Sequence, residues 1–486
     1  VIIGGATPRI LKNRGSLQDI DQIAVMKSLV KWYTTIKSYK ELSKVNEGFY
    51  RAQEGVPGPV FVEIPIDILW PLSMVNKLFG TGSKNLLNSN SLSGRLIKLY
   101  VDRYTRKTFK GASYFSIPTK IPVTRKIISD KILEKIVITI EESKKPLLLI
   151  GSQGVNDVNL IDSIIEAVER LHIPVYLSGM ARGLLGKNHK LQFRHRRKDS
   201  LGESDLIILA GVPVDFRLDY GSVFNRKAKV ISVNLDKKIL KKNKRATFKS
   251  DTHPGQFLID IGQSVISSKD NWTAWFDALR KREEERNNEI IALSKQKMER
   301  INPLRLCCEL EKTLSDNTIL IGDGGDFIAT ISYILQPRRP LSWLDPGPFG
   351  TLGVGAGFAL AAKLVFPDKD VWILYGDGSV GYTIAEYDTF IRHKLPIIGL
   401  VGNDSGWMQV AREQMEVFND SIGTELGDRS YERVVDGFGA KGLLLNDEST
   451  IESIIKQAVV VTNAGLPVLI NAFIGRSKFR KGSISM

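Results

Sequence analysis

The chain has 486 residues, of which 43% are hydrophobic and 25% charged. This composition is typical of globular proteins and excludes disordered, collagen-like and coiled-coil classes for the bulk of the chain. The net charge of +15 permits an acidic partner. The two cysteines, Cys307 and Cys308, are neighbours in sequence. A disulfide-stapled scaffold is therefore excluded, and a reducing compartment is favoured.

The first segment of the chain is predicted to contain strands bounded by turns. Residues 1–5 have a strand pattern that is already under way at Val1, so we expect the chain to be N-terminally incomplete, with any signal peptide or anchor outside it. A Gly/Pro turn leads into a buried strand over residues 60–64, which Pro65 stops. No apolar run reaches the roughly 18 residues of a membrane span, and the longest, residues 354–366, is broken by a lysine.

Strands and helices then alternate at the spacing typical of parallel sheets. Residues 76–125 are polar, then basic, and without a clear period, which predicts a linker. The sequence predicts an α/β fold of three doubly wound parallel-sheet domains, the first incomplete. The predicted segments are a first domain over 1–75, a linker over 76–125, a central domain over 126–265, a helical connector over 266–300 and a third domain over 301–486.

Two basic runs account for much of the charge, one over residues 187–198 and one over residues 237–245. Neither run interleaves aromatic residues as a single-strand binder does, so no nucleic-acid partner is expected. Each run is interpreted as solvated surface, with contact to phosphate groups as the alternative. The run over 187–198 is the better phosphate candidate because it follows a glycine-containing loop over residues 179–186.

The sharpest signal is a pair of polar turns after two consecutive apolar strands. GDGS follows the strand over 371–375, and GNDSG ends the next strand. Loops at the carboxyl ends of adjacent parallel strands lie together. Asp377 should therefore meet Asn403 and Asp404, although 26 or 27 residues separate them. Oxygen ligands of this kind suit Mg²⁺ shared with phosphates.

This pattern resembles the signature of the thiamine diphosphate (ThDP) enzyme family, in which GDG is followed about 25 residues later by two asparagines. The chain departs from it at Asp404, which stands where the second asparagine usually ligates the metal. Aspartate is at least as good a ligand for Mg²⁺, so Asn403 and Asp404 both remain candidates. The resemblance implies ThDP and Mg²⁺ as cofactors, with Asp377 and the backbone oxygen of Gly406 completing the metal site.

Further segments resemble the cofactor loops of the family. In PFGTLG (348–353), Leu352 matches the bulky residue that wedges the two cofactor rings into a V shape. Residues 15–18 match an early G-x-F/L-Q turn whose Gln18 would face the cofactor, and GPVFVEIPIDIL (58–69) resembles the closing strand of a pyrimidine-binding domain. The implied cofactor-binding residues are Asp323, Gly324, Gly325, Gly350, Thr351, Leu352, Gly376, Asp377, Gly378, Ser379, Asn403 and Asp404.

The order of segments matches the acetolactate synthase and 2-hydroxyacyl-CoA lyase group, with pyrimidine-binding, central and diphosphate-binding domains. The strings GMARGLLGKNH (179–189) and WLDPGPFGTLGVGAGFAL (343–360) look very like the endoplasmic-reticulum lyases of animals, also called acetolactate synthase-like proteins. The resemblance implies a carbon–carbon lyase of fatty acid α-oxidation. Such an enzyme cleaves long-chain 2-hydroxyacyl-CoA to formyl-CoA and an aldehyde one carbon shorter.

The catalytic residues are only partly assigned. The glutamate that the group uses early in its pyrimidine domain would lie upstream of Val1. Gln18 and His393 are the catalytic candidates within the chain. His393, His195 and Asp326 are candidates for the base that takes the proton of the 2-hydroxyl group.

Two other functions remain open: an acetolactate synthase-like carboligase acting on 2-oxo acids, and a non-catalytic binding or regulatory subunit on the same fold. FAD is not expected, because the central domain shows no convincing flavin pattern. The resemblance implies a small-molecule acyl-CoA substrate and a homodimer or homotetramer. It also implies an endoplasmic-reticulum membrane location, with membrane contact only through an anchor before Val1.

Overall fold

The computed structural model describes residues 1–81, 92–112, 121–243, 246–265 and 269–480. The chain divides into two compact units, residues 1–125 and residues 126–486. Each unit is described by itself below. No helix among the described residues is both long and apolar enough to cross a membrane.

The first unit contains a three-stranded parallel sheet in the order β1-β3-β2. Its strands are β1 (Ile2–Ala6), β2 (Trp32–Thr35) and β3 (Val60–Pro65). The central strand β3 is buried along its whole length, as its run of β-branched and aromatic residues predicts. Helix α2 (Ser43–Gln53) packs against it, and the short helices α1 (Gln22–Met26) and α3 (Ile66–Leu69) flank the sheet.

The stretch predicted as a linker carries regular structure in the described residues. Helix α4 (Leu72–Thr81) reaches into it, and α6 (Leu92–Phe109) lies wholly inside it. The buried face of α6 consists of Gly94, Val101, Thr105 and Thr108. Three of these four residues are not apolar, so the helix has no hydrophobic period that the sequence could reveal.

The second unit begins with a six-stranded parallel sheet in the order β6-β5-β4-β7-β8-β9. Its inner strands are buried apolar runs, the expected pattern for a sheet covered on both faces. The strands are β4 (Pro146–Ile150), β5 (Val175–Leu177), β6 (Gln192–Phe193), β7 (Leu206–Ala210), β8 (Lys229–Val233) and β9 (Phe248–Ser250). The helices of this part are α7 (Asp130–Glu141), α8 (Ile161–Leu171), α9 (Arg197–Glu203) and α10 (Pro254–Ser264).

A second six-stranded parallel sheet follows in the order β11-β10-β12-β13-β15-β14. Its strands are β10 (Thr318–Gly322), β11 (Trp343–Leu344), β12 (Asp370–Gly376), β13 (Ile398–Asn403), β14 (Lys441–Leu445) and β15 (Val468–Phe473). The helices are α12 (Pro303–Thr313), α13 (Asp326–Ile334), α14 (Gly355–Val365), α15 (Asp377–Thr383), α16 (Glu386–Arg392), α17 (Met408–Phe418), α18 (Tyr431–Gly437) and α19 (Ile451–Asn463). The three parallel sheets confirm the predicted α/β class.

Both faces of this last sheet are covered by helices. Leu374 of β12 packs among residues of α12, α13 and α19, whereas its neighbours Ile373 and Tyr375 pack among residues of α14, α16 and α18. This alternation is what the period of two in a strand requires.

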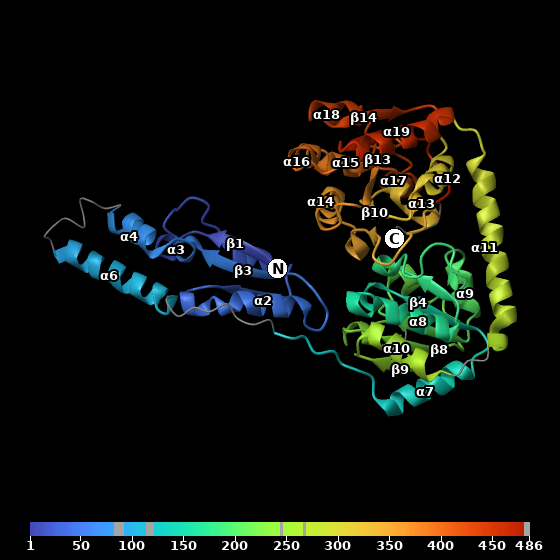
Figure 1. The fold of residues 1–486 in the computed structure, drawn as a ribbon, viewed down its shortest axis with the longest axis horizontal. Helices are drawn as coiled ribbons and strands as arrows, with labels where there is room; N and C mark the ends of the chain where they lie inside the picture. Colours follow the sequence, from blue (N-terminus) through green and yellow to red (C-terminus); the bar gives the residue numbers. More distant parts are fainter. Residues whose placement is uncertain (82–91, 113–120, 244–245, 266–268, 481–486) are drawn as a thin grey trace. The chain divides into compact units, whose positions relative to one another are not determined.

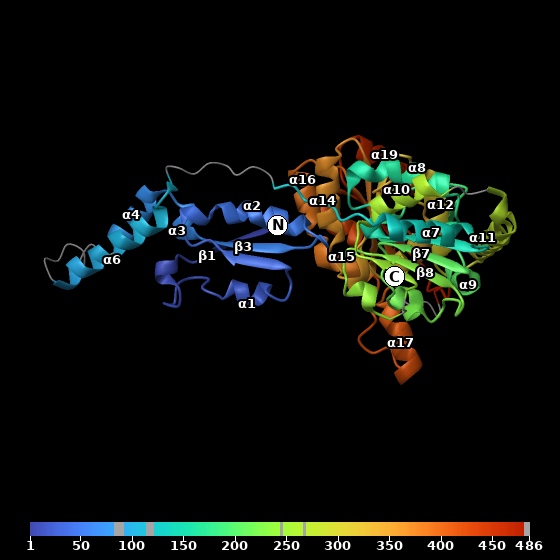
Figure 2. The same cartoon turned by 90° about the horizontal axis from the view of Figure 1, so that it is seen from below.

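The long helix α11 (Thr273–Ser294) connects the two sheets of the second unit (Figure 1). Near its start, the Trp275 indole donates a hydrogen bond to the Pro146 carbonyl at the beginning of β4. Near its end, Ile290 joins the core of the third domain. Figure 2 shows the same elements from below.

Candidate functional site

The predicted site lies where β12 and β13 end. The two strands are hydrogen-bonded neighbours, and Gly376 pairs with Gly402 in their register. Each strand therefore delivers its polar turn to the same edge of the sheet. The carboxylate of Asp377 accepts a hydrogen bond from the backbone N–H of Gly406 at 2.8 Å. The structure thus brings together the two turns that the sequence predicted to meet.

Asp377 is buried at the first residue of α15. Its other carboxylate oxygen accepts from the N–H of Gly378 at 2.8 Å. Burial nevertheless raises the pKa of Asp377 to about 6, because the two backbone donors only partly offset the loss of water around the charge.

Asp404 is also buried, and desolvation raises its pKa to about 8, with the nearby charges of Asp377 and Asp326 adding to the rise. Among the described residues, no basic side chain forms a salt bridge with Asp377 or Asp404. Two buried carboxylates close together disfavour joint ionisation unless a cation compensates them. A hard divalent cation such as Mg²⁺ would supply that compensation.

Asn403 holds the turn together. Its side-chain amide donates to the Asn471 side chain at 3.1 Å and to the Arg429 carbonyl at 3.2 Å. Its side-chain oxygen accepts from the N–H of Ser405. Because these bonds engage both ends of the amide, the structure favours Asp404 over Asn403 as a side-chain metal ligand.

A third turn lies beside these two. Asp323, which follows β10, is fully buried and accepts 2.8 Å hydrogen bonds from the N–H groups of Gly353 and Gly355. Burial raises the pKa of Asp323 above its ordinary value. These two bonds tie the loop that contains Leu352 to the end of β10.

Glycine is required where these turns meet. A Cβ at Gly324 would lie 2.1 Å from the Leu352 side chain, and one at Gly376 would lie 2.8 Å from the Gly324 carbonyl. A Cβ at Gly378 would lie 2.4 Å from the Trp407 ring. The backbone is therefore bare in the region where the family would hold a diphosphate, which fits such a group.

The remaining predicted cofactor residues have more limited roles. Gly350 and Thr351 are exposed in the loop before Leu352. The Ser379 hydroxyl lies 3.1 Å from both the N–H and the carbonyl of Gly376, so it supports the first turn of α15. Gly325 begins α13 with a φ of 114°.

The structure places His393 away from this edge of the sheet. His393 is exposed at the end of α16 and precedes β13, so it lies toward the opposite, amino edge of the sheet. This placement argues against His393 as the base. Gln18 is exposed in the first unit.

The other two candidate bases already have side-chain partners. His195 is buried and lies 3.0 Å from the Asn287 side-chain oxygen. Desolvation lowers the pKa of His195 to about 4, which keeps the ring neutral at pH 7. Asp326 pairs with Arg412 at 2.6 Å.

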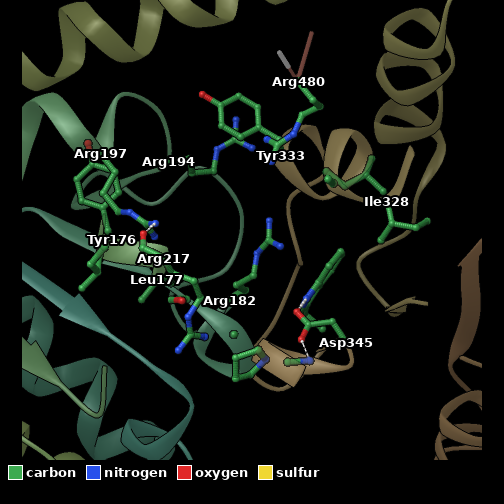
Figure 3. A pocket seen from close by; sticks show the side chains of 18 of the residues that line it. Tyr176, Leu177, Arg182, Arg194, Arg197, Arg217, Ile328, Tyr333, Asp345 and Arg480 are labelled. Carbon is green, nitrogen blue, oxygen red and sulfur yellow. Dashed lines mark hydrogen bonds between the residues drawn. The ribbon is translucent and has the colours of Figure 1, made fainter. Parts of the chain in front are cut away.

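A cavity of about 1110 Å³ lies between the central sheet and the third domain. Asp323, Gly324, Gly325, Gly350 and Leu352 line one side of it. Its other side is strongly basic. The basic residues in the lining are Arg182, Arg194, Arg196, Arg197, Lys198, Arg217, Arg286 and Arg480. Figure 3 shows the arginines of the central domain facing Ile328, Tyr333 and Asp345 of the third domain.

Arg182 belongs to the central domain, but it contacts residues of the third domain. Its guanidinium lies 4.3 Å from the centre of the Trp343 ring and donates to the Ser332 carbonyl. Its second terminal nitrogen, Nη1, is buried without a hydrogen-bond partner. Burial lowers the pKa of Arg182 to about 10, with the charge of Asp345 opposing the shift and the positive charges of Arg194 and Arg197 adding to it.

Arg197 lies at the start of α9 and donates to the Arg217 carbonyl at 3.0 Å. Burial lowers its pKa from the ordinary value. Within the described part of the chain, neither Arg182 nor Arg197 has a carboxylate salt-bridge partner. The sequence analysis identified Arg197 as part of the basic run over 187–198. It did not identify Arg182 or Arg217, because both lie outside the two basic runs.

Comparison with known proteins connects these features to a family. The thiamine pyrophosphate enzyme central domain matches residues 133–259, and the C-terminal TPP binding domain of the same enzymes matches residues 323–472. The chain is 42% identical to 2-hydroxyacyl-CoA lyase 2 of Danio rerio, over all of this chain and 79% of that protein. It is 38% identical to 2-hydroxyacyl-CoA lyase 2 of Homo sapiens, over all of this chain and 77% of that protein.

More distant proteins agree. The acetolactate synthase large subunit IlvG of Mycobacterium tuberculosis is 26% identical over 97% of this chain and 78% of its own length. A thiamine diphosphate-dependent 4-hydroxybenzoylformate decarboxylase from Rhodococcus jostii RHA1 has the same fold, with a TM-score of 0.73 and 17% identity over 98% of this chain and 82% of that one. The chain therefore belongs to the thiamine pyrophosphate enzyme family and is a thiamine diphosphate-dependent lyase.

Proposed function

We propose that the protein cleaves long-chain 2-hydroxyacyl-CoA to formyl-CoA and an aldehyde one carbon shorter, with ThDP and Mg²⁺ as cofactors. The observation that carries the proposal is the cavity that joins the turns around Leu352 to an arginine-rich wall. The names of the relatives at 38–42% identity support the same substrate class.

Asp377 and Asp404 would hold Mg²⁺, and the bare backbone at Gly376 and Gly378 would receive the diphosphate. Leu352 would support the middle of the cofactor from the loop that Asp323 fixes. When bound, ThDP supplies the electron sink that carbon–carbon cleavage beside a carbonyl group requires.

The basic wall would hold the phosphate groups of coenzyme A. Guanidinium groups bind phosphate through charge-assisted hydrogen bonds, and they bind more strongly where water is excluded. Arg182 and Arg197 are the best placed, because both are desolvated and neither is neutralised by a carboxylate among the described residues. The cavity is also lined by acidic residues, so its charge is not uniform: Asp199, Asp219, Glu289, Asp323 and Asp345.

The reaction can be tested directly. The protein, with ThDP and Mg²⁺, should release an aldehyde one carbon shorter than the acid when it is given 2-hydroxyoctadecanoyl-CoA. Pyruvate should yield little acetolactate. If pyruvate alone is consumed, the protein is a synthase of the acetolactate type and the proposal is wrong. If neither substrate is consumed and ThDP does not raise the melting temperature, a non-catalytic subunit is the better interpretation.

The phosphate contacts have their own test. Arg182→Gln and Arg197→Gln should each raise KM for the acyl-CoA about tenfold or more while changing kcat less, because a charged hydrogen bond contributes about 1.5–3 kcal/mol. Lys190→Gln is the matched control, since Lys190 is exposed in the same basic run and does not line the cavity. Equal effects of all three substitutions would contradict the assignment of the arginine wall.

We further propose a role in fatty acid α-oxidation at the endoplasmic-reticulum membrane, which rests on the resemblance to the animal lyases. Imaging of the full-length protein with an endoplasmic-reticulum marker tests the location. Accumulation of 2-hydroxy fatty acids in cells that lack the protein tests the role. Localisation to another compartment would contradict the first part.

A further inference from the structure

Helix α6 presents an outward face whose character changes along its length. Its first half exposes apolar side chains: Leu92, Leu96, Leu99 and Tyr100 are 81%, 63%, 60% and 55% exposed. Leu96 follows Leu92 by four residues, and Leu99 and Tyr100 follow Leu96 by three and four, so the four side chains lie on one side of the helix. Side chains of this size are expensive to leave in water in such number, so their exposure needs an explanation.

The same side of the helix is basic in its second half. Arg103, Arg106 and Lys107 continue the line of the apolar residues, Lys110 follows directly after the helix, and all four are exposed. None of them forms a salt bridge within the described residues, and Asp102 is the only acidic residue of α6. These eight residues are called the α6 outer face.

The opposite side fixes the helix to the first unit. The Tyr104 hydroxyl donates to the fully buried carboxylate of Asp67. Arg9 bonds the same carboxylate at 2.8 Å and donates to the Thr108 hydroxyl at 2.7 Å. Because these bonds hold the helix by its inner side, the α6 outer face is a surface that the fold presents.

Helix α4 extends the apolar region. It lies beside α6 in both views of the fold (Figures 1 and 2) and packs against it. Leu72, Met74 and Leu78 of α4 are between 43% and 46% exposed. Both helices of this pair therefore expose large apolar side chains.

We propose that the α6 outer face docks on the surface of a membrane that contains anionic lipids. Its apolar half would enter the boundary between headgroups and acyl chains, and its basic half would contact the lipid phosphates. Leucine and tyrosine on one side of a helix with arginine and lysine beside them are the composition of helices that lie in a bilayer interface. The docking does not depend on the cleavage reaction proposed above.

Charge favours a lipid surface over a protein partner. The cores of protein–protein interfaces are depleted in lysine. The α6 outer face instead carries four positive charges with no acidic side chain among its members. A surface of anionic headgroups complements this arrangement, and the long arginine and lysine side chains can reach it while the apolar half inserts.

Vesicle flotation tests the proposal. The protein should float with vesicles of phosphatidylcholine and phosphatidylserine and much less with phosphatidylcholine alone, and added NaCl should weaken the binding because it screens the charges. The triple variant R103Q/R106Q/K107Q should lower the partition coefficient at least about tenfold. The double variant L96Q/L99Q should lower it on both kinds of vesicle.

Matched controls come from the second unit. K237Q/K238Q/K241Q removes three exposed charges from the other basic run, and V158Q/V460Q removes two exposed apolar side chains. Both controls should float like the parent protein. Flotation of the α6 variants equal to that of the parent or of the controls would overturn the proposal. The proposal would also fail if the parent protein did not float with vesicles and the α6 substitutions changed its sedimentation coefficient. That result would show that a second copy of the chain covers the α6 outer face.

Discussion

At the scale of single residues, the site is defined by two buried carboxylates that form no salt bridge within the described residues. Asp377 uses its two oxygens to accept from the N–H groups of Gly378 and Gly406, and Asp404 lies on the turn that Gly406 closes. Burying a carboxylate costs several kcal/mol unless its charge is compensated. A metal ion bound between them would recover that cost, so the turns are built for a ligand.

Replacing Asp377 by alanine should remove Mg²⁺-dependent binding of ThDP. Loss of one partner from a buried charged site costs about 3–5 kcal/mol, which corresponds to a loss of affinity of about 100-fold or more. Titration calorimetry with ThDP and Mg²⁺ measures the change. Asp388→Ala is the control, because Asp388 is exposed and pairs with Arg392 on α16. Unchanged ThDP affinity in the Asp377 variant would contradict the assignment.

Proton competition should make metal binding depend on pH. Without metal, the raised pKa of Asp404 means that the folded protein holds a proton between pH 4 and pH 8 that the unfolded chain releases. The stability of the unloaded protein should therefore fall as pH rises through this window. Mg²⁺ binds the ionised form, so its affinity should rise about tenfold per unit between pH 6 and pH 8.

Asp404→Asn checks this cause. The asparagine can still ligate through its oxygen but has no proton to lose, so the dependence on pH between 6 and 8 should become nearly flat. The dependence is measured from melting temperatures with and without Mg²⁺ and ThDP at pH 6 and pH 8. A slope that persists in the asparagine variant would assign the titration to another group.

At the scale of elements, the site depends on tight connections between strand ends. Asp323 joins the end of β10 to the loop before α14 by bonds to Gly353 and Gly355. The loop presses Leu352 so closely against Gly324 that a Cβ there would lie 2.1 Å from the leucine side chain, which would have to move. The position of Leu352 is therefore set by an acidic side chain 29 residues earlier in the sequence.

Asp323→Ala should loosen this loop. Two N–H groups would lose their acceptor, at about 1–3 kcal/mol for each one left unsatisfied in a buried site. We expect a lower melting temperature and a weaker affinity for ThDP. Asp447→Ala is the control, because Asp447 accepts from the Ser449 N–H in an exposed turn and its loss should matter less. Equal losses of stability in the two variants would argue against a special role for Asp323.

Sequence patterns could predict the elements and the meeting of the two turns, because both depend on local order. Apolar runs such as β4 and β12 mark buried strands, and parallel pairing then places their carboxyl ends together. The choice between Asn403 and Asp404 could not be predicted, since it depends on Asn471, 68 residues away. Helix α6 could not be predicted because its buried face is largely polar. The role of Arg182 could not be predicted because its partners Ser332 and Trp343 lie in another domain.

At the scale of the whole molecule, large apolar side chains remain exposed near the site in the second unit. Phe349 is 88% exposed in the loop that carries Leu352. Phe418 and Ile422 are 74% and 77% exposed at the end of α17 and just after it. A partner subunit would cover such a surface, and the family resemblance implies that each active site is shared between two chains.

The protein should therefore sediment as a homodimer or homotetramer. F418D/I422D should shift it toward the monomer, because two charges would be buried at the interface without partners. The same variant should lose activity in proportion to the dissociation. V460D is the control, since Val460 is 67% exposed on α19 and belongs to the same unit without lying near the site turns. Analytical ultracentrifugation with parallel activity assays gives both readouts. A parent protein that is monomeric and active would show that one chain completes the site by itself.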